Sequence, residues 1–299
     1  MQNRLMVPQR TPLLLDLAPG AAAAFSLRQL SNSYTGPVVT VRRSTDSAEA
    51  NFTANEIDSG DLASWCMGGD GFVKQWWDQS GHARHASQAT TASQPKIVSA
   101  GVVILEGGKP AVKFDGVDDW LRHTPSSEWA FFHQNDCAAF LACRIGVIDN
   151  PNTYYPLFCT GSISSSIVGA DLWWDDRAAS SMSDALRYSN ATGSANIAVI
   201  DFKDSVIANR FSIVSALMSP GNATLVNKCL YYANGAKALV TSSAGTGGAP
   251  SASNPSNMTI GGQANLGKLL DGTISELIIY PRDMTAERQL VEGNMAWYY

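Results

Sequence analysis

Short apolar runs separated by turn residues dominate the chain. Glycine, proline, asparagine or aspartate punctuates most of the intervals between these runs, as in Gly68-Gly69-Asp70 and Asp115-Gly116. The runs that read as strands are Val38–Val41, Gly71–Trp77, Val102–Leu105, Ala111–Phe114, Ala138–Ile145, Tyr155–Cys159, Ile197–Asp201, Arg210–Met218, Leu230–Tyr232, Met258–Ile260 and Thr273–Tyr280. Many short strands with glycine-rich turns predict an all-β fold, a β-sandwich or jelly roll.

Two local signals add detail to this picture. Asn234-Gly235 is a strong two-residue hairpin signal, which joins Cys229–Ala233 to Ala236–Thr241. Helical spacing of apolar residues predicts one C-terminal helix over Thr285–Tyr298, with Thr285 as its N-cap, and we expect it to close the end of the sandwich. A single helical turn is expected at Asp61–Met67. No internal repeat or linker is visible, so residues 25–299 read as one sandwich domain.

The first 24 residues form a segment of different character. Three prolines break any helix up to position 19, so this segment reads as an extended N-terminal arm, and Asp16 closes its longest apolar run too early for a signal peptide. The arm is either a disordered tail or an anchor that docks on another subunit. The docking arm is favoured, because a solvated tail rarely carries four leucines: Leu13, Leu14, Leu15 and Leu17.

Composition narrows the classes of partner. Charged residues make up only 16% of the 299 residues and the net charge is −5, with no basic stripe, so no nucleic acid is expected as a partner. No window approaches the roughly 20 apolar residues of a membrane span. Five scattered cysteines without metal-binding spacing predict reduced, structural thiols in a protein made in a reducing cytoplasm.

Eight tryptophans are many for this length, and one pair stands beside acidic residues. Trp173-Trp174-Asp175-Asp176 combines flat apolar rings with hydroxyl-accepting carboxylates, which is the chemistry of a sugar-binding platform. An interface between subunits explains the same rings equally well, and both readings stay open. For the other tryptophans considered, burial in the core is the expectation: Trp76, Trp77, Trp120 and Trp297.

Other candidate chemistry is weaker. Asp118-Asp119 and Asp175-Asp176 could supply oxygen ligands to Ca²⁺, although adjacent carboxylates on a solvated turn are commoner; apart from this possible Ca²⁺, no metal or other cofactor is predicted. His82 and His85 are expected in a surface loop. Asp78 and Asp115 are expected to fix turns through side-chain hydrogen bonds to the backbone.

Several runs carry a resemblance to known families. Phe25–Glu49 and Trp76–Thr90 resemble the start of the concanavalin-like sandwich in fungal-type α-L-arabinofuranosidases. They look even more like non-enzymatic relatives of that sandwich in bacteriophage structural proteins, whose leaders resemble Leu13–Ala24. Later segments resemble strands of laminin-G-like domains: Phe114–Leu121, Leu230–Gly235 and Asp271–Tyr280. The resemblance implies a concanavalin A-like jelly roll of two sheets, often used for carbohydrate recognition.

The same resemblance bears on catalysis. A glycosidase needs a carboxylic acid, and the arabinofuranosidase pattern implies that this acid follows a late Gly-Gly pair. In this sequence Gly261-Gly262 is followed by Gln263. The amide of a glutamine cannot donate and retrieve a proton. The nucleophile's segment has only Asp171 or Asp175 as acidic candidates. We therefore expect no enzymatic activity and no catalytic residue.

The resulting hypothesis is a non-enzymatic bacteriophage virion surface protein, of the tail fibre, spike or capsid-decoration type. Its arm would bind other virion proteins, and its lectin-like face would contact host-surface glycan or neighbouring subunits in a homo-oligomer. The expected location is the virion surface, after synthesis in the bacterial host cytoplasm. The alternative is a glycoside hydrolase of arabinofuranosidase type, and a free carbohydrate-binding module is a third, weaker reading.

Overall fold

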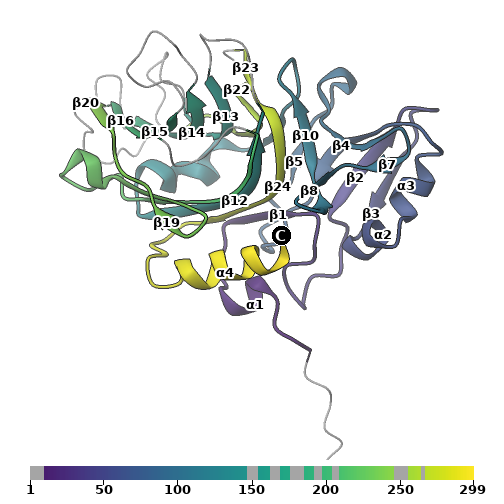
Figure 1. Cartoon of the computed structure of the whole chain (residues 1–299), viewed down its shortest axis with the longest axis horizontal. Helices are drawn as coiled ribbons and strands as arrows, with labels where there is room; N and C mark the ends of the chain where they lie inside the picture. Colours follow the sequence, from purple (N-terminus) through teal and green to yellow (C-terminus); the bar gives the residue numbers. More distant parts are fainter. Residues whose placement is uncertain are drawn as a thin grey trace, which may run out of the picture.

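A computed structural model gives the fold of the chain (Figure 1). The structure describes residues 10–146, 154–161, 169–175, 185–191, 197–203, 209–245, 255–263 and 267–299. Strands predominate, as the turn-punctuated sequence predicts. Among the described residues, no helix has both the length and the apolar character that crossing a bilayer requires.

The first layer is an antiparallel sheet centred on the long strand β24. One edge of β24 pairs with β12 along its length, and the other edge pairs with β1 and then with β10. The sheet continues from β12 through β17 and β18 to β19. Its strands are β1 (Ala23–Ser26), β10 (Val112–Asp115), β24 (Asp271–Tyr280), β12 (Cys137–Ile145), β17 (Phe211–Met218), β18 (Cys229–Ala233) and β19 (Ala236–Lys237).

The second layer is also antiparallel. In order across the sheet it contains β20 (Ser242–Gly245), β16 (Ile197–Lys203), β15 (Ala185–Ala191), β14 (Gly169–Asp175), β13 (Tyr154–Cys159), β21 (Met258–Ile260), β11 (Leu121–His123), β5 (Ala86–Ser87), β4 (Gly71–Trp76), β2 (Val39–Arg43) and β3 (Glu49–Phe52). Strand β6 (Lys96–Ser99) pairs with both β4 and β10 and so joins the two layers. The shorter strands are β7 (Val102–Val103), β8 (Leu105–Glu106), β9 (Lys109–Pro110), β22 (Gly262–Gln263) and β23 (Lys268–Leu269).

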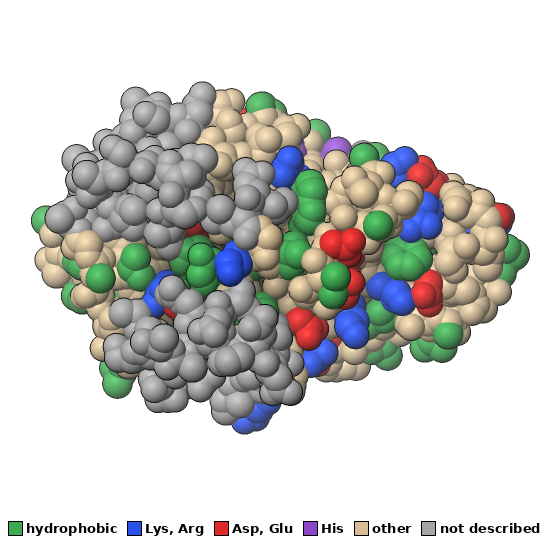
Figure 2. Space-filling view, turned by 90° about the horizontal axis from the view of Figure 1, so that it is seen from above, with side chains coloured by type: hydrophobic (Ala, Val, Ile, Leu, Met, Phe, Trp, Pro, Cys, Tyr) green, Lys and Arg blue, Asp and Glu red, His purple; other side chains and the backbone are tan. Residues whose placement is uncertain are grey.

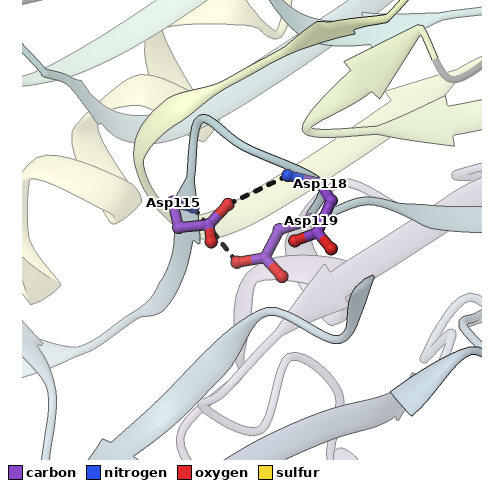
Figure 3. A group of neighbouring side chains, drawn as sticks. All are labelled: Asp115, Asp118 and Asp119. Carbon is purple, nitrogen blue, oxygen red and sulfur yellow. Dashed lines mark hydrogen bonds between the residues drawn. The ribbon is translucent and has the colours of Figure 1, made fainter. Parts of the chain in front are cut away.

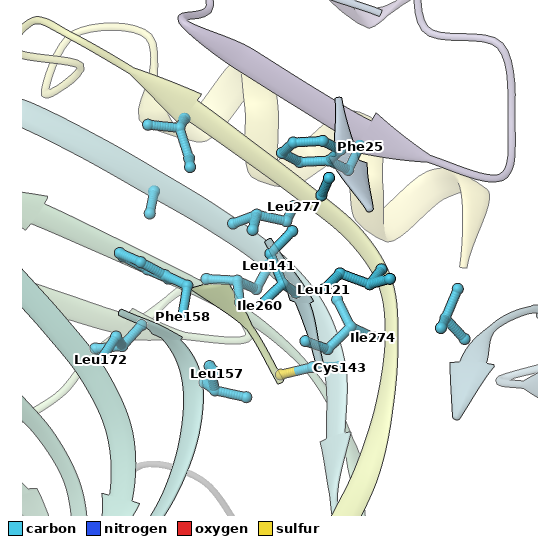
Figure 4. Packing of buried hydrophobic residues seen from close by; sticks show 14 of the residues in the cluster. Phe25, Leu121, Leu141, Cys143, Leu157, Phe158, Leu172, Ile260, Ile274 and Leu277 are labelled. Atoms are coloured by element: carbon cyan, nitrogen blue, oxygen red, sulfur yellow. The ribbon is translucent and has the colours of Figure 1, made fainter. Parts of the chain in front are cut away.

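The main hydrophobic core lies between the layers (Figure 4). Alternation along β12 sends Leu141 and Cys143 into this core, where they meet Leu277 of β24 and Leu172 and Phe158 of the opposite layer. Burial of one such side chain contributes roughly 1.5–3 kcal/mol, so the two sheets are held mainly by these contacts. The predicted all-β jelly-roll sandwich is confirmed.

The outer face of the first sheet carries a second apolar cluster. Phe140 of β12 and Tyr280 of β24 point away from the main core and pack against Val291 and Met295 of the C-terminal helix. This helix, α4, spans Arg288–Tyr298. It begins three residues later than predicted, and it covers a face of the sheet (Figure 1) instead of closing the end of the sandwich. The apolar residues on the outer surface of the sheet are covered in part by α4.

The described part of the N-terminal arm packs on the same outer face. Leu14 and Leu15 belong to a short helix, α1 (Leu14–Leu17), and both are buried in the second apolar cluster, whereas Leu17 is exposed. Leu13 precedes this helix, and its backbone N–H donates to Asp16 Oδ2 at 2.9 Å. The arm is thus helical over one turn, and two of its four leucines serve the chain's own core. Docking of the arm on a second subunit stays a prediction.

The remaining helices are short. Helix α3 (Asp61–Trp65) confirms the expected single turn, and it follows α2 (Ala54–Asp58), which the sequence analysis did not predict. The signal for α2 was present: Thr53 and Glu56 form a capping box, in which each side chain satisfies a backbone N–H of the other. The 3₁₀ helices are η1 (Thr91–Ser93), η2 (Ser126–His133) and η3 (Leu225–Asn227).

Other local predictions have mixed outcomes. The Asn234-Gly235 hairpin is confirmed, with positive φ at both turn residues. The five cysteines are free and buried, as predicted for structural thiols. Trp76 is fully buried, but Trp297 is 83% exposed on α4, so its assignment to the core is wrong. The helical stripe that faces the sheet is formed by Val291 and Met295, and Trp297 lies outside it.

Candidate active site

Strand β14 presents two different faces because side chains alternate along a strand. Leu172 and Trp174 point into the core between the layers, whereas Asp171, Trp173 and Asp175 lie on the opposite face of the sheet. All five side chains are buried. A polar and aromatic surface therefore covers the outer side of β14, and the neighbouring strands β13, β15 and β16 extend it.

An arginine from the next strand joins two carboxylates on this face. Arg187 lies opposite Trp173 in the β14–β15 pairing and opposite Asp201 in the β15–β16 pairing. Its Nη1 is 2.7 Å from Asp175 Oδ2, and its Nε donates to Asp201 Oδ1 at 2.5 Å. One buried guanidinium therefore forms ion pairs with two carboxylates on this face. Asp201 Oδ2 has no hydrogen-bond partner.

Asp171 has a different environment, in which no arginine or lysine pairs with it among the described residues. It lies beside Cys159 and Ser189 on the flanking strands, and its Oδ1 accepts a hydrogen bond from Gly161 N at 2.9 Å. Burial raises the pKa of Asp171 to about 6, against the opposing effect of the Gly161 N–H and the side chains of Cys159 and Ser189. A carboxyl group with such a pKa can carry a proton near neutral pH, which is what a general acid requires.

Gln263 lies next to Asp171. Its Nε2 donates to Gly161 O at 3.1 Å, so the two side chains bind opposite ends of the same glycine residue. Gln263 Oε1 is buried without a hydrogen-bond partner. The amide of Gln263 occupies the position at which the resemblance implies an acid. The carboxyl group of Asp171 contacts the same glycine, Gly161.

Aromatic rings form one end of this surface. The rings of Tyr154 and Trp173 are 4.6 Å apart, and Lys268 Nζ lies 4.7 Å from the centroid of the Tyr154 ring. Trp173 Nε1 is buried without a hydrogen-bond partner. Three polar atoms on one face, those of Trp173, Asp201 and Gln263, thus lack partners, although buried polar groups are normally paired. Such orphaned groups are typical of a surface prepared for a ligand.

The predicted platform residues divide between the two faces. Trp173 and Asp175 lie together on the outer face, Trp174 belongs to the core, and Asp176 lies outside the described residues. The sequence analysis missed Arg187 and Asp201. The signal available was their alternation with core residues along Ala185–Ala191 and Ile197–Lys203, which points both charges to the same side.

A second group of carboxylates lies on the turn after β10. Ligand oxygens of Asp115, Asp118 and Asp119 are within 4.8 Å of one another (Figure 3). Asp115 Oδ1 accepts from the backbone N–H groups of Val117 and Asp118, which confirms the predicted turn. Burial, followed by repulsion from Asp115, raises the pKa of Asp119 to about 7. Binding of Ca²⁺ here stays a prediction.

The other predicted turn is also confirmed. Asp78 Oδ1 accepts hydrogen bonds from Ser80 N at 2.9 Å and from Ala24 N at 2.8 Å. His85 Nδ1 accepts from Asp78 N, whereas His82 is exposed. These two histidines therefore belong to a loop held by Asp78, as predicted.

Comparisons with known proteins connect this fold to carbohydrate-active enzymes. A family model described as the catalytic domain of α-L-arabinofuranosidase B matches residues 16–103. The sandwich is related to the sandwich domain of arabinofuranosidases. The match covers the strands from β1 to β7 and ends before the candidate active site. A search of curated proteins found no match.

Solved structures are similar in fold over more of the chain. An arabinofuranosidase complexed with arabinofuranosyl-α-1,2-xylobiose has a TM-score of 0.57 at 15% identity, over 92% of this chain. A GH54 α-L-arabinofuranosidase variant soaked with 4-nitrophenyl α-L-arabinofuranoside has a TM-score of 0.54 at 14% identity, also over 92% of this chain. This chain spans 62% of the length of each of these proteins.

These findings correct the functional predictions. The hypothesis of a non-enzymatic bacteriophage virion surface protein is wrong, because the matching family model is that of an enzyme's catalytic domain and nothing in the comparisons indicates a bacteriophage. The expectation of no enzymatic activity is wrong for the same reason. It relied on the amide at Gln263, whereas the fold brings the carboxyl group of Asp171 beside that amide from another strand.

Proposed function

We propose that the protein is a glycoside hydrolase of arabinofuranosidase type, with its active site on the outer face of β13–β16. The observation that carries this proposal is that two carboxyl groups in unlike environments lie on one buried face, on β14 and on β16. Asp171 has a pKa raised to about 6 by burial, whereas Asp201 forms an ion pair with Arg187. Glycoside hydrolysis uses such a pair, one group as a proton donor and one as an ionised carboxylate.

Each side chain has a defined role in this proposal. Asp171 donates its proton to the oxygen that links the arabinofuranosyl group to its carrier, and the bond between that oxygen and the anomeric carbon breaks. A water molecule then forms the new bond to the anomeric carbon and gives its proton to the Asp171 carboxylate, which restores the acid. Asp201, through the oxygen that has no partner in the protein, faces the positive charge that develops on the sugar. Arg187 donates to Asp201 and fixes its position, so Arg187 is a positioning residue.

The relatives support the choice of sugar. The solved structures named above are of arabinofuranosidases with arabinofuranosides, and the family model is that of an arabinofuranosidase catalytic domain. Trp173 and Tyr154 supply aromatic rings at one end of the face, and the orphaned polar atoms of Gln263 and Trp173 supply an acceptor and a donor for sugar hydroxyls.

The test compares two substrates that differ in their leaving group. Wild-type protein is expected to release 4-nitrophenol from 4-nitrophenyl α-L-arabinofuranoside and arabinose from soluble arabinoxylan. Asp201→Asn should lose roughly 10²–10⁴-fold in kcat on both. For Asp171→Asn, kcat on arabinoxylan should fall by at least the same factor. On the nitrophenyl substrate kcat should fall far less, because nitrophenolate departs without a proton.

A matched control is Asp58→Asn, which neutralises an exposed aspartate on α2 and should leave both activities unchanged. Wild-type protein that hydrolyses neither substrate would refute the proposal. An Asp171→Asn variant that loses equally on both substrates would remove Asp171 from the role of general acid.

A further inference from the structure

A cavity of about 470 Å³ opens where β6 and β10 meet β24, outside the active-site face described above. This volume falls within the ~300–1,000 Å³ range of small-molecule sites. Its lining combines the acids Asp115 and Asp119, the lysines Lys96 and Lys113, and the ring of Phe72. Figure 2 shows one face of the molecule. Beside the atoms drawn in grey, charged side chains of both signs surround hydrophobic ones on this face.

Two lysines lie side by side in the lining of this cavity. Lys96 of β6 and Lys113 of β10 are direct partners in the strand register, an arrangement that destabilises a sheet unless the charges find other partners. Lys96 has an oppositely charged partner of its own, because its Nζ is 2.7 Å from Asp70 Oδ2. Lys113 is exposed and forms no ion pair within 4 Å among the described residues, so its three N–H donors are open to a ligand.

The acidic side of the cavity supplies acceptors. Asp119 is buried, and its Oδ2 accepts from Asp115 N at 3.1 Å, which uses only one of the carboxylate's several acceptor positions. A simple cation in the cavity would meet Lys96 and Lys113, and a simple anion would meet Asp115 and Asp119. A neutral molecule with many hydroxyl groups satisfies both sides, because each hydroxyl donates to a carboxylate and accepts from an ammonium group.

The cavity is also connected to the candidate active site by direct packing. Gly262 leaves no room for a side chain, because a Cβ atom there would lie 2.9 Å from Trp120 Cβ and 3.6 Å from Asp119 O. The turn that carries Asp119 therefore packs against the residue preceding Gln263. Gln263 in turn binds Gly161, which binds Asp171. Gly262, Gln263 and Gly161 therefore link the turn that lines the cavity to Asp171.

We propose that this cavity binds a neutral sugar chain, the part of a polysaccharide to which the arabinofuranosyl group is attached. The proposal rests on the proposed function, since it makes a decorated polysaccharide, and not a small glycoside, the substrate. Lys113 donates to the chain's hydroxyls, Asp115 and Asp119 accept from them, and Phe72 offers an apolar surface to the sugar ring.

Binding is tested separately from hydrolysis by affinity electrophoresis of the full chain in gels that contain soluble neutral arabinoxylan. Wild-type protein is expected to be retarded, and Lys113→Ala should bind about tenfold more weakly, as expected for the loss of a charged hydrogen-bond donor. Lys237→Ala is the matched control, because it removes the same charge from an exposed position on β19 and should bind like wild type. Phe72→Ala gives a second, uncharged probe of the cavity.

The outcomes separate the two proposals. Retardation that depends on Lys113 supports the cavity site, even if the protein releases no arabinose and the proposed hydrolase function fails. Hydrolysis that depends on Asp171, together with wild-type affinity in both Lys113→Ala and Phe72→Ala, supports the hydrolase and overturns the cavity site. Absence of any retardation of wild-type protein, or retardation by acidic polygalacturonate alone, also overturns the cavity site.

Discussion

Neutralising Asp171 should change how the stability of the protein depends on pH. The change is Asp171→Asn, which keeps a side-chain oxygen that can accept from Gly161 N but removes the ionisable group. Asp171 is buried on the outer face of β14, where no cation pairs with it among the described residues. The charged form is therefore disfavoured in the native state, and its pKa rises from the ordinary 3.8 to about 6.

The direction and size of the effect follow from that shift. Below pH 3.8 Asp171 is protonated in both the native and the unfolded state, so its contribution to stability is fully present. As the pH rises from 3.8 through about 6, the unfolded chain releases the proton first, and native stability falls. The full loss is about 3 kcal/mol. Between about pH 4 and about pH 7.5, the loss is about 2 kcal/mol.

The measurement is the free energy of unfolding in urea at those two pH values, for wild type and for Asp171→Asn. Far-ultraviolet circular dichroism and tryptophan fluorescence should give coincident transitions, which justifies two-state treatment. The variant should gain about 2 kcal/mol relative to wild type on going from the lower to the higher pH. Because other carboxyl groups titrate equally in both proteins, their contributions cancel in this difference.

Asp58→Asn serves as the control, since Asp58 is exposed on α2, and its pH-dependent difference from wild type should be small. If Asp171→Asn follows the same pH dependence as wild type to within about 0.5 kcal/mol, Asp171 is not a desolvated carboxyl group. Its assignment as the general acid would then lose its physical basis.

Three further substitutions test the packing that supports the site. Arg187→Met should destabilise the fold by about 3–5 kcal/mol in urea unfolding, because it leaves two buried carboxylates without their shared cation. Gly261→Ala should cost more than about 2 kcal/mol, because φ is +73° and the new Cβ would lie 2.2 Å from a phenylalanine ring. Leu14→Ala should cost about 2–5 kcal/mol, because its side chain is buried between the arm and the sheet.

Each of these substitutions has a milder counterpart. Arg282→Met removes a half-exposed ion pair and should cost less than about 1 kcal/mol. Gly235→Ala shares a positive φ of +81° but meets no atom within 4 Å, so it should cost only about 1 kcal/mol. Leu17→Ala removes an exposed side chain and should change stability by less than about 0.5 kcal/mol. Equal costs within any pair would contradict the packing assigned to that position.

The sequence by itself determined the class of fold and much of its local structure. Alternation of apolar residues with turn signals predicted the sandwich, Asn234-Gly235 predicted a hairpin, and the spacing of Val291 and Met295 predicted a C-terminal helix. These features depend on backbone preferences and on periodicity, which act between residues close together in the chain. The sequence analysis placed Trp173 and Trp174 in one platform, whereas alternation along β14 puts them on opposite faces, with Trp174 in the core.

Only the tertiary structure decided which chemical groups meet. Arg187 contacts Asp175 and Asp201 because three strands align in one register, and a slip of one residue would turn the arginine into the core. Gln263 lies beside Asp171 through Gly161, 102 residues earlier in the chain. Sequence reasoning looked for the acid at position 263 and considered Asp171 only for the nucleophile's segment. The structure brings the carboxyl group of Asp171 to this position from another strand, because the environment of a site depends on pairing between strands that the local sequence does not encode.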